Sequence, residues 1–458
     1  MAADSQNVKK IAADSPEKQS GSSLGTIIRF GLIAVLVGVI AKPYLFKTSE
    51  PAKAQSFQIA GETMGTVWTA TVCADAQTLT EKDLTVDAAA EPAKSCEELL
   101  QRFIQKQLDA VDLAASTFKP ESDISRFNAS QSTEWFPVSE TTAQIVQIAL
   151  DVAQKTGGAF DPTVAPLVDL YRFGPNKAPL VQFPSDANIA KRLENVGYNK
   201  LEVRLEPEPA LRKSVPGLTL DLSGVAKGFA VDRVAQALED QGLTDYLVEV
   251  GGETRCGGQK TRFDLDSNAL VQTPWRLGIE APEIARDGQR YIPRPYRAVV
   301  FNSVVPATPA SDAAASDSAK RPNTALATSG DYHNYRQIGD LRFSHIVDPR
   351  SGKPTEIVDV GAPAPGERLG AVSVVAENCA EADAFATAFF VLGEKEGIAL
   401  ADKLGVAVLY VFRSDDSALE IRDVASQAFQ TNVESELLPS DAPADEPATQ
   451  EKAQSDAK

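Results

Sequence analysis

The stretch TLDLSGVAKGFAVDRVAQALEDQGLTDYLVEVGGE, residues 219–253, decides the fold that the sequence predicts. Residues 219–222 alternate between apolar and polar side chains like a short strand, and a turn-forming Ser-Gly pair follows them. Across residues 225–238 the apolar side chains recur at helical spacing. A second strand pattern occupies residues 246–250. The stretch therefore predicts a strand, a helix and a second strand as one unit around which the rest of the chain folds.

Lys227 lies in the first turn of this predicted helix, beside Gly224, Ala226 and Gly228. A cation is unfavourable there by about 0.3–1 kcal/mol, because the helix dipole is positive at the N-terminus. The small neighbours would let a ligand approach the backbone, and a phosphate or diphosphate is a natural ligand of a helix N-terminus. The residues alone leave two interpretations open, a bound anion or a solvated lysine. The pattern is neither a Walker A loop nor a GxGxxG fingerprint.

The composition describes an acidic globular protein. The chain has 458 residues, of which 43% are hydrophobic and 24% are charged, so it can form a substantial core in one or two domains. Its net charge of −18 and its isoelectric point near 4.7 argue against a nucleic-acid partner, because no basic surface would follow a phosphate backbone. Anion binding must therefore be local, at a helix start or through a metal ion.

Residues 1–54 predict export. They contain the run FGLIAVLVGVIA, residues 30–41, behind Arg29, and residues 52–54 resemble a signal-peptide cleavage site. A run of this length is short for a membrane span, although an extension to residues 25–46 would give a usable anchor. We therefore expect a signal peptide or a membrane anchor, and the sequence leaves the choice open.

The other end of the chain and the cysteines give further expectations. Residues 431–458 are rich in acidic residues, Ser, Pro and Ala, which predicts a disordered acidic tail. Cys73 and Cys96 flank a polar stretch and either form a disulfide in an oxidising compartment or stay unpaired. We expect Cys256 and Cys379 to be buried singly, since no spacing suggests zinc.

Asp383 and Thr387 are candidate metal ligands. They lie four residues apart on a helix predicted at residues 380–391, which Gly393 ends, so they share one helix face. They offer two hard oxygen ligands, which Mg²⁺ prefers together with phosphate oxygens. The alternative is structural: a first-turn carboxylate that the dipole favours, and a threonine bonded back to a backbone carbonyl.

Seven motifs occur in one order along residues 56–412, and together they resemble the ApbE family of FAD:protein FMN transferases. The motifs are ETMGT (62–66), STFKP…SRFN (116–128), GGAFDPT (157–163), LDLSGVAKG (220–228), TSGDY (328–332), SHIVDPRSG (344–352) and ADAFATA (382–388). The resemblance implies an α+β fold with two related subdomains that resembles the tunnelling fold, with the flavin bound between them. It implies a transferase domain at residues 55–430. Polar inserts near residues 74–95, 282–294 and 302–323 have no counterpart in the family's core.

The resemblance also implies the ligand residues. Mg²⁺ would be held by Asp383, Thr387 and the backbone carbonyl of Gly224. The family often has tyrosine at Phe118, so a ring remains for the isoalloxazine and the hydroxyl contact is lost. FAD contacts are implied for Met64, Phe118, Ala159, Phe160, Asp161, Asp221, Lys227 and Ile346.

The implied reaction is Mg²⁺-dependent transfer of FMN from FAD to a threonine hydroxyl of an acceptor protein, with release of AMP. His345, with an ordinary pKa near 6.5, is the candidate catalytic base, and Asp383 is the catalytic metal ligand. A histidine bonded to the Asp348 turn is the structural alternative.

Similar proteins modify membrane-bound respiratory flavoprotein subunits on the outer face of the membrane. We therefore expect such an acceptor, and a location on the periplasmic side of the inner membrane. A Mg²⁺-dependent FAD diphosphatase, in which water replaces threonine, is the main alternative function. An exported flavin-binding protein without catalysis is the other.

Overall fold

The computed structural model describes residues 55–438, with gaps. The gaps are residues 77–78, 80–83, 85–92, 176–177, 265–266, 283–293, 302–324, 332–333, 360–365 and 415–420. The predicted signal or anchor segment, most of the three predicted inserts and the chain after residue 438 thus lie outside the described residues. No helix in the described ranges is both long enough and apolar enough to cross a membrane.

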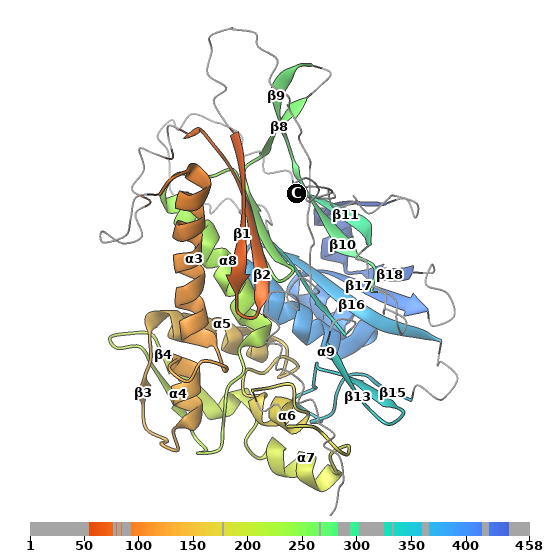
Figure 1. The fold of residues 1–458 in the computed structure, drawn as a ribbon. Coiled ribbons are helices and arrows are strands. Elements are labelled where there is room, and N and C mark those ends of the chain that lie inside the picture. The colour runs from red at the N-terminus through yellow and green to blue at the C-terminus, as the bar shows by residue number, and fades with distance from the viewer. Residues whose placement is uncertain are drawn as a thin grey trace, which may run out of the picture. The chain divides into compact units, whose positions relative to one another are not determined.

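An antiparallel sheet of eight strands is the centre of the fold (Figure 1). In spatial order its strands are β1 (Gln55–Thr63), β2 (Thr66–Ala74), β6 (Tyr246–Val250), β7 (Glu253–Gly257), β12 (Ala325–Gly330), β16 (Glu367–Ala376), β17 (Ala407–Ser414) and β18 (Ile421–Ala425). The pairs Ala325–Arg255 and Leu326–Thr254 join β12 to β7. They connect two halves of four strands each, as expected for two related subdomains.

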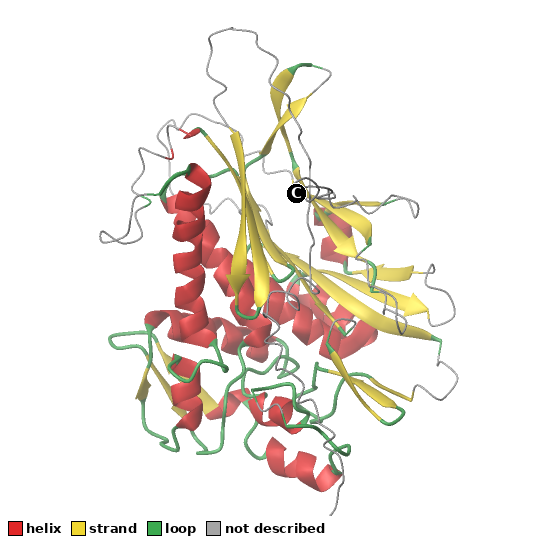
Figure 2. Ribbon diagram, viewed as in Figure 1, coloured by secondary structure: helices red, strands yellow, loops and turns green. Residues whose placement is uncertain are grey.

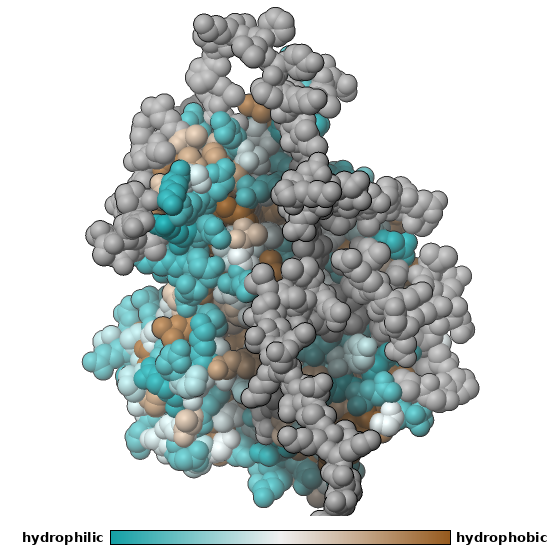
Figure 3. Space-filling model, in the orientation of Figure 1, coloured by the Kyte–Doolittle hydropathy of each residue, from teal (hydrophilic) through white to brown (hydrophobic). Residues whose placement is uncertain are grey.

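Four long helices pack on one face of this sheet (Figure 2). They are α3 (Cys96–Ala115), α5 (Glu140–Lys155), α8 (Ser223–Asp240) and α9 (Cys379–Leu404). Each is amphipathic or buried: α3, for example, buries Leu100, Ile104 and Leu108 at helical spacing. Figure 3 shows mostly hydrophilic residues on the outer surface around α3, which is the opposite side of that helix.

A second layer covers the other face of the sheet. It contains β10 (Trp275–Glu280), β11 (Pro295–Phe301), α10 (Gln427–Asn432) and β19 (Glu434–Leu437). Because both faces are covered, β17 is apolar at nearly every position: Val408 and Tyr410 pack toward the helices, and Leu409 and Val411 pack toward the second layer.

The remaining elements are short. They are α4 (Asp123–Ala129), β3 (Phe136–Pro137), α6 (Ala165–Leu170), α7 (Asp186–Leu193), β4 (Leu201–Arg204), β5 (Ala210–Lys213), β8 (Lys260–Asp264), β9 (Ala269–Thr273), β13 (Tyr335–Ile338), β14 (Leu341–Ser344), β15 (Ile357–Asp359) and a 3₁₀ turn (Tyr198–Lys200). Strands β13, β14 and β15 form a small sheet whose Phe343 packs against Tyr171 of the α6 region.

The structure corrects two predictions. The residues before α8 are not a strand of any sheet, because the side chain of Asn128 takes the place of a neighbouring strand: Asn128 Nδ2 donates to Leu220 O (2.9 Å) and Leu220 N donates to Asn128 Oδ1 (2.7 Å). The predicted acidic tail begins too early, since Glu434–Leu437 pairs with β11.

The structure also decides the state of the cysteines, which the sequence left open. Cys73 and Cys96 do not form a disulfide, because Cys73 is buried toward the second layer whereas Cys96 packs on the helix side. Cys256 and Cys379 are buried and unbridged, as expected. The helix at Asp383 also agrees with prediction: α9 is interrupted at Gly393, which has φ +70°.

Helices α8 and α9 cross at Gly228. A Cβ atom added at Gly228 would lie 2.2 Å from the carbonyl oxygen of Cys379, so only glycine allows this approach. Four residues further along α8, Asp232 accepts hydrogen bonds from the N–H groups of Cys379 and Ala380, each at 2.9 Å. One helix thus caps the start of the other, and the N-terminal turns of both are fixed side by side.

Candidate active site

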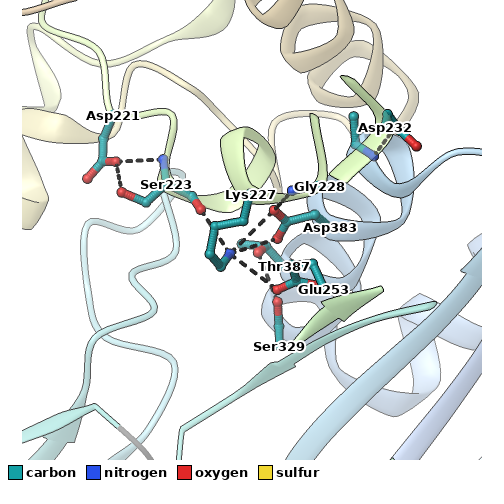
Figure 4. A network of polar contacts seen from close by, with 10 residues as sticks. Asp221, Ser223, Lys227, Gly228, Asp232, Glu253, Ser329, Asp383 and Thr387 are labelled. Atoms are coloured by element: carbon teal, nitrogen blue, oxygen red, sulfur yellow. Dashed lines mark hydrogen bonds and ion pairs between the residues drawn. The ribbon is translucent and has the colours of Figure 1, made fainter. Parts of the chain in front are cut away.

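The N-terminal parts of α8 and α9 meet the ends of two central strands in one polar cluster (Figure 4). Lys227 Nζ lies 3.2 Å from Glu253 Oε1 and 3.4 Å from each carboxylate oxygen of Asp383. Asp383 Oδ2 also accepts the N–H of Gly228 at 3.1 Å. The cluster comprises Lys227 on α8, Asp383 and Thr387 on α9, Glu253 on β7 and Ser329 on β12.

Two carboxylates share one ammonium in this cluster. The side chains of Asp383 and Glu253 are 3% and 4% exposed, whereas that of Lys227 is 27% exposed. Desolvation would lower the pKa of Lys227, but the charges of Asp383 and Glu253 outweigh it and raise that pKa. Burial and the charge of Asp383 raise the pKa of Glu253 above its usual range, and burial raises the pKa of Asp383.

This arrangement changes the interpretation of Lys227. The sequence alone leaves two interpretations of Lys227 open, a bound anion or a solvated lysine at the helix start. The protein itself supplies the anions, Glu253 and Asp383, and neither interpretation anticipated them. Contact between Lys227 and FAD stays a prediction.

The three predicted metal ligands lie together. A Cβ atom at Gly224 would be 3.1 Å from Thr387 Oγ1, so the first turn of α8 faces the third turn of α9. Thr387 Oγ1 lies 3.0 Å from Ser329 Oγ, which differs from the predicted structural alternative of a bond back to a helix carbonyl. Backbone φ and ψ of −90° and 16° at Gly224 interrupt the helix there.

These residues fit a hard divalent cation. The carboxylate of Asp383, the hydroxyl of Thr387 and the carbonyl of Gly224 are oxygen donors of the kind that Mg²⁺ prefers. Glu253 Oε2 is buried and has no hydrogen-bond partner among the described residues, so positive charge would be stabilised here. The described ranges contain no group of three or more His, Cys, Asp or Glu that would hold a metal alone. A metal at Asp383 would therefore need threonine, backbone and ligand oxygens.

Met64 forms the tip of the β1–β2 hairpin beside this cluster. The two-residue turn Met64-Gly65 has φ values of +48° and +74°, the conformation that favours tight hairpins but is uncommon for methionine. A Cβ atom at Gly251 would lie 2.9 Å from Thr66 and 3.4 Å from Lys227 Cδ. The hairpin tip is thus held against the first turn of α8, where the sequence predicts Met64 to meet the flavin.

The predicted FAD residues 159–161 form a buried loop next to Gly224. Phe160 Cε2 would be 3.2 Å from a Cβ atom at Gly224. Asp161 accepts from Thr163 N at 2.8 Å and from Tyr198 N at 2.8 Å, so both of its oxygens bind the protein. Burial raises the pKa of Asp161. Its carboxylate holds the loop in shape, and a direct FAD contact stays a prediction.

The other predicted FAD residues surround the start of α8 or lie on nearby loops. Asp221 Oδ1 accepts the N–H and hydroxyl of Ser223, and Asp221 N donates to Pro162 O at 2.9 Å. Asp221 therefore links the first turn of α8 to the 157–163 loop. Phe118 is 59% exposed after α3, as a ring that stacks on a ligand would be, whereas Ile346 is buried.

His345 is held by a backbone carbonyl. Its Nδ1 lies 2.9 Å from the carbonyl oxygen of Asn334, which can only accept, so Nδ1 carries the proton and Nε2 is the basic nitrogen. Phe173 packs edge-to-face on the ring at 6.1 Å. Desolvation lowers the pKa of His345 to about 4, well below its ordinary value near 6.5.

The structural alternative for His345 is wrong in its partner, because the ring binds the carbonyl of Asn334 and not the Asp348 turn. Asp348 accepts from the N–H and the guanidinium of Arg350 instead. His345 is thus free of the Asp348 turn, and it stays neutral over the whole physiological range of pH.

Sequence reasoning missed Glu253, Ser329 and Asp232. Glu253 directly follows Gly251-Gly252, and an acidic residue after a glycine pair at a strand end is a usable signal. Asp232 looks like an ordinary helix-surface residue, because its role as a cap for α9 depends on the crossing of two helices far apart in sequence.

A family model described as the ApbE family matches residues 64–410. The chain belongs to the ApbE family. Its relatives include the FAD:protein FMN transferase of Vibrio cholerae, 32% identical over 377 residues that cover 82% of this chain and 92% of the relative. The FAD:protein FMN transferase of Escherichia coli strain K12 is 32% identical over 394 residues, 85% of this chain and 94% of the relative.

Solved ApbE structures share the fold. The flavin transferase ApbE from Vibrio cholerae matches with a TM-score of 0.59 and 30% identity, over 82% of this chain and 99% of that one. The apo form of the Pseudomonas stutzeri flavinyl transferase ApbE matches with a TM-score of 0.60 and 27% identity, over 84% and 98%. The predicted family and its α+β fold are confirmed.

Proposed function

We propose that this chain is a FAD:protein FMN transferase that moves FMN from FAD to a threonine hydroxyl of an acceptor protein and releases AMP. The relatives that it matches over most of their length carry that name. The observation that carries the proposal is the meeting of two helix N-termini at Asp383, Thr387 and Gly224, beside an unsatisfied buried carboxylate oxygen. Helix N-termini favour the negative charge of a diphosphate.

Asp383, Thr387 and the Gly224 carbonyl would hold Mg²⁺, which would neutralise charge on the diphosphate and on the leaving AMP. Lys227 would add a second positive charge beside the diphosphate. The hairpin tip at Met64 and the exposed ring of Phe118 would position the isoalloxazine.

His345 Nε2 would accept the proton of the acceptor threonine. The threonine oxygen then bonds to the phosphorus on the FMN side of the diphosphate, and the bond from that phosphorus to the bridging oxygen breaks as AMP leaves. A neutral imidazole is ready to accept a proton at pH 7 because the His345 pKa is about 4.

The acceptor and location belong to the same proposal. The N-terminal apolar run at residues 30–41 supports export, either as a signal peptide or as an anchor at the periplasmic side of the inner membrane. An acceptor at that surface would be a membrane-bound respiratory flavoprotein subunit that carries the threonine.

The test is to incubate the full-length protein with FAD and Mg²⁺, with and without a threonine-bearing acceptor segment. We expect AMP together with a covalent, fluorescent flavin adduct on the acceptor, detected by mass spectrometry. An acceptor with alanine in place of threonine should remain unlabelled. Equal FMN and AMP without an adduct would show a FAD diphosphatase, and FAD binding without AMP would show a binding protein.

A further inference from the structure

Glu253 is a buried carboxylate next to the proposed metal site, and it is none of the three proposed ligands. Its Oε1 pairs with Lys227 at 3.2 Å, and its Oε2 has no hydrogen-bond partner among the described residues. An unsatisfied buried carboxylate oxygen is costly, so it calls for an explanation. Glu253 lies at the start of β7, in the central sheet, which makes it a fixed point in the cluster.

Lys227 contacts acceptors on both sides of the site. Its Nζ bridges Glu253 and Asp383 at 3.2 and 3.4 Å, and it also donates to Ser223 O at 3.2 Å. A lysine ammonium is a point charge on a flexible four-carbon stem, so it can shift between neighbouring acceptors without a change in the backbone. Asp383, in contrast, is held in place by the Gly228 N–H.

A divalent cation and Lys227 cannot both stay against Asp383. Two positive charges at this separation repel each other, and a divalent ion doubles the repulsion. Binding at Asp383 therefore requires Lys227 to withdraw. Glu253 is the carboxylate already in contact with Lys227, and its free Oε2 can take a second ammonium hydrogen bond.

We propose that Glu253 is a positioning residue that receives Lys227 when a divalent cation binds Asp383. Lys227 is then the cation that pairs with Asp383 when no metal is bound. Glu253 determines the free energy that the metal needs to displace Lys227. The inference rests on the proposed metal site and adds to it a competition between Lys227 and the metal.

The test measures Mg²⁺ affinity by isothermal titration calorimetry on the full-length protein at pH 8.5 without FAD. Glu253→Gln should bind Mg²⁺ about tenfold more weakly, equivalent to about 1.4 kcal/mol, since Lys227 keeps only Asp383 as counter-ion. Lys227→Gln should bind Mg²⁺ about tenfold more tightly, because the competing ammonium is gone. The matched control is Glu249→Gln, which removes a carboxylate from the neighbouring strand β6 and should leave the affinity unchanged.

The outcomes separate this inference from the proposed function. If Glu253→Gln binds Mg²⁺ with wild-type affinity, the proposed role of Glu253 is wrong and the metal site is unaffected. If Glu253→Gln does not fold, wild-type Mg²⁺ affinity of Lys227→Gln has the same meaning. An equal loss in Glu249→Gln also overturns it, because the effect would then be a general one of charge. If the wild-type protein binds no Mg²⁺, the metal site and this inference both fail.

Discussion

Replacement of Asp383 separates its chemical role from its structural one. Asp383 is 2% exposed and accepts the Gly228 N–H at 3.1 Å. Asp383→Asn keeps an oxygen for that hydrogen bond, and Lys227 keeps Glu253 as its partner, so we expect a loss of unfolding free energy of about 1 kcal/mol or less. Asp383→Ala leaves the buried N–H unsatisfied and should cost about 1–3 kcal/mol.

Activity should fall in both variants, because neither retains the carboxylate. If the metal contributes about 3–4 kcal/mol to stabilisation of the transition state, AMP release from FAD should fall about 100- to 1,000-fold. Loss of activity without loss of stability in Asp383→Asn would therefore identify the carboxylate as a ligand.

The measurements are AMP release across a Mg²⁺ titration and urea unfolding of the same preparations. Glu381→Gln is the matched control, since it removes a partly exposed carboxylate from the same turn of α9 and should keep activity within about twofold of wild type. Full activity of Asp383→Asn at low Mg²⁺ would refute the metal assignment. Equal destabilisation by Asn and Ala would refute the account of the Gly228 hydrogen bond.

Three further predictions follow from the same cluster and its neighbours. Lys227→Ala leaves two buried carboxylates without their cation and should lower the free energy of unfolding by roughly 3 kcal/mol, which Mg²⁺ should partly restore. A urea unfolding curve that matches wild type would contradict the ion pairs described for Lys227. His345→Ala should lower the rate of FMN transfer about 100-fold or more. The ratio of wild-type to variant rate should be the same from pH 5.5 to 8, because His345 is neutral above a pKa of about 4. A ratio that changes around pH 6.5 would show that His345 has an ordinary pKa. Gly228→Ala should lower the stability measured by thermal unfolding by about 1–3 kcal/mol and reduce activity, because the added Cβ meets the carbonyl oxygen of Cys379. Wild-type stability of this variant would mean that α8 and α9 can move apart without cost.

The sequence was sufficient for features that depend on short-range spacing. The helix at residues 225–238 follows from apolar residues on one face, and the shared helix face of Asp383 and Thr387 follows from their separation of four. The order of the seven motifs was sufficient to identify the family, because that order can be read from the sequence without knowledge of the fold.

Features that depend on partners distant in sequence could not be predicted from the spacing of residues. Residues 219–222 have the pattern of a strand, but Asn128, which lies 92 residues before Leu220, provides the hydrogen bonds of a neighbouring strand. The disulfide between Cys73 and Cys96 was compatible with the spacing, and only the packing on opposite faces of the sheet excludes it.

The site itself shows the same division. The sequence places Lys227 in a helix start, where a cation needs an anion, and it says nothing of which anion. Tertiary structure decides that Glu253 and Asp383 are the anions, and it lowers the His345 pKa to about 4. Ion pairing and desolvation depend on which groups pack together and how much water they exclude, so these charges are determined only when α8, α9 and the central sheet come together.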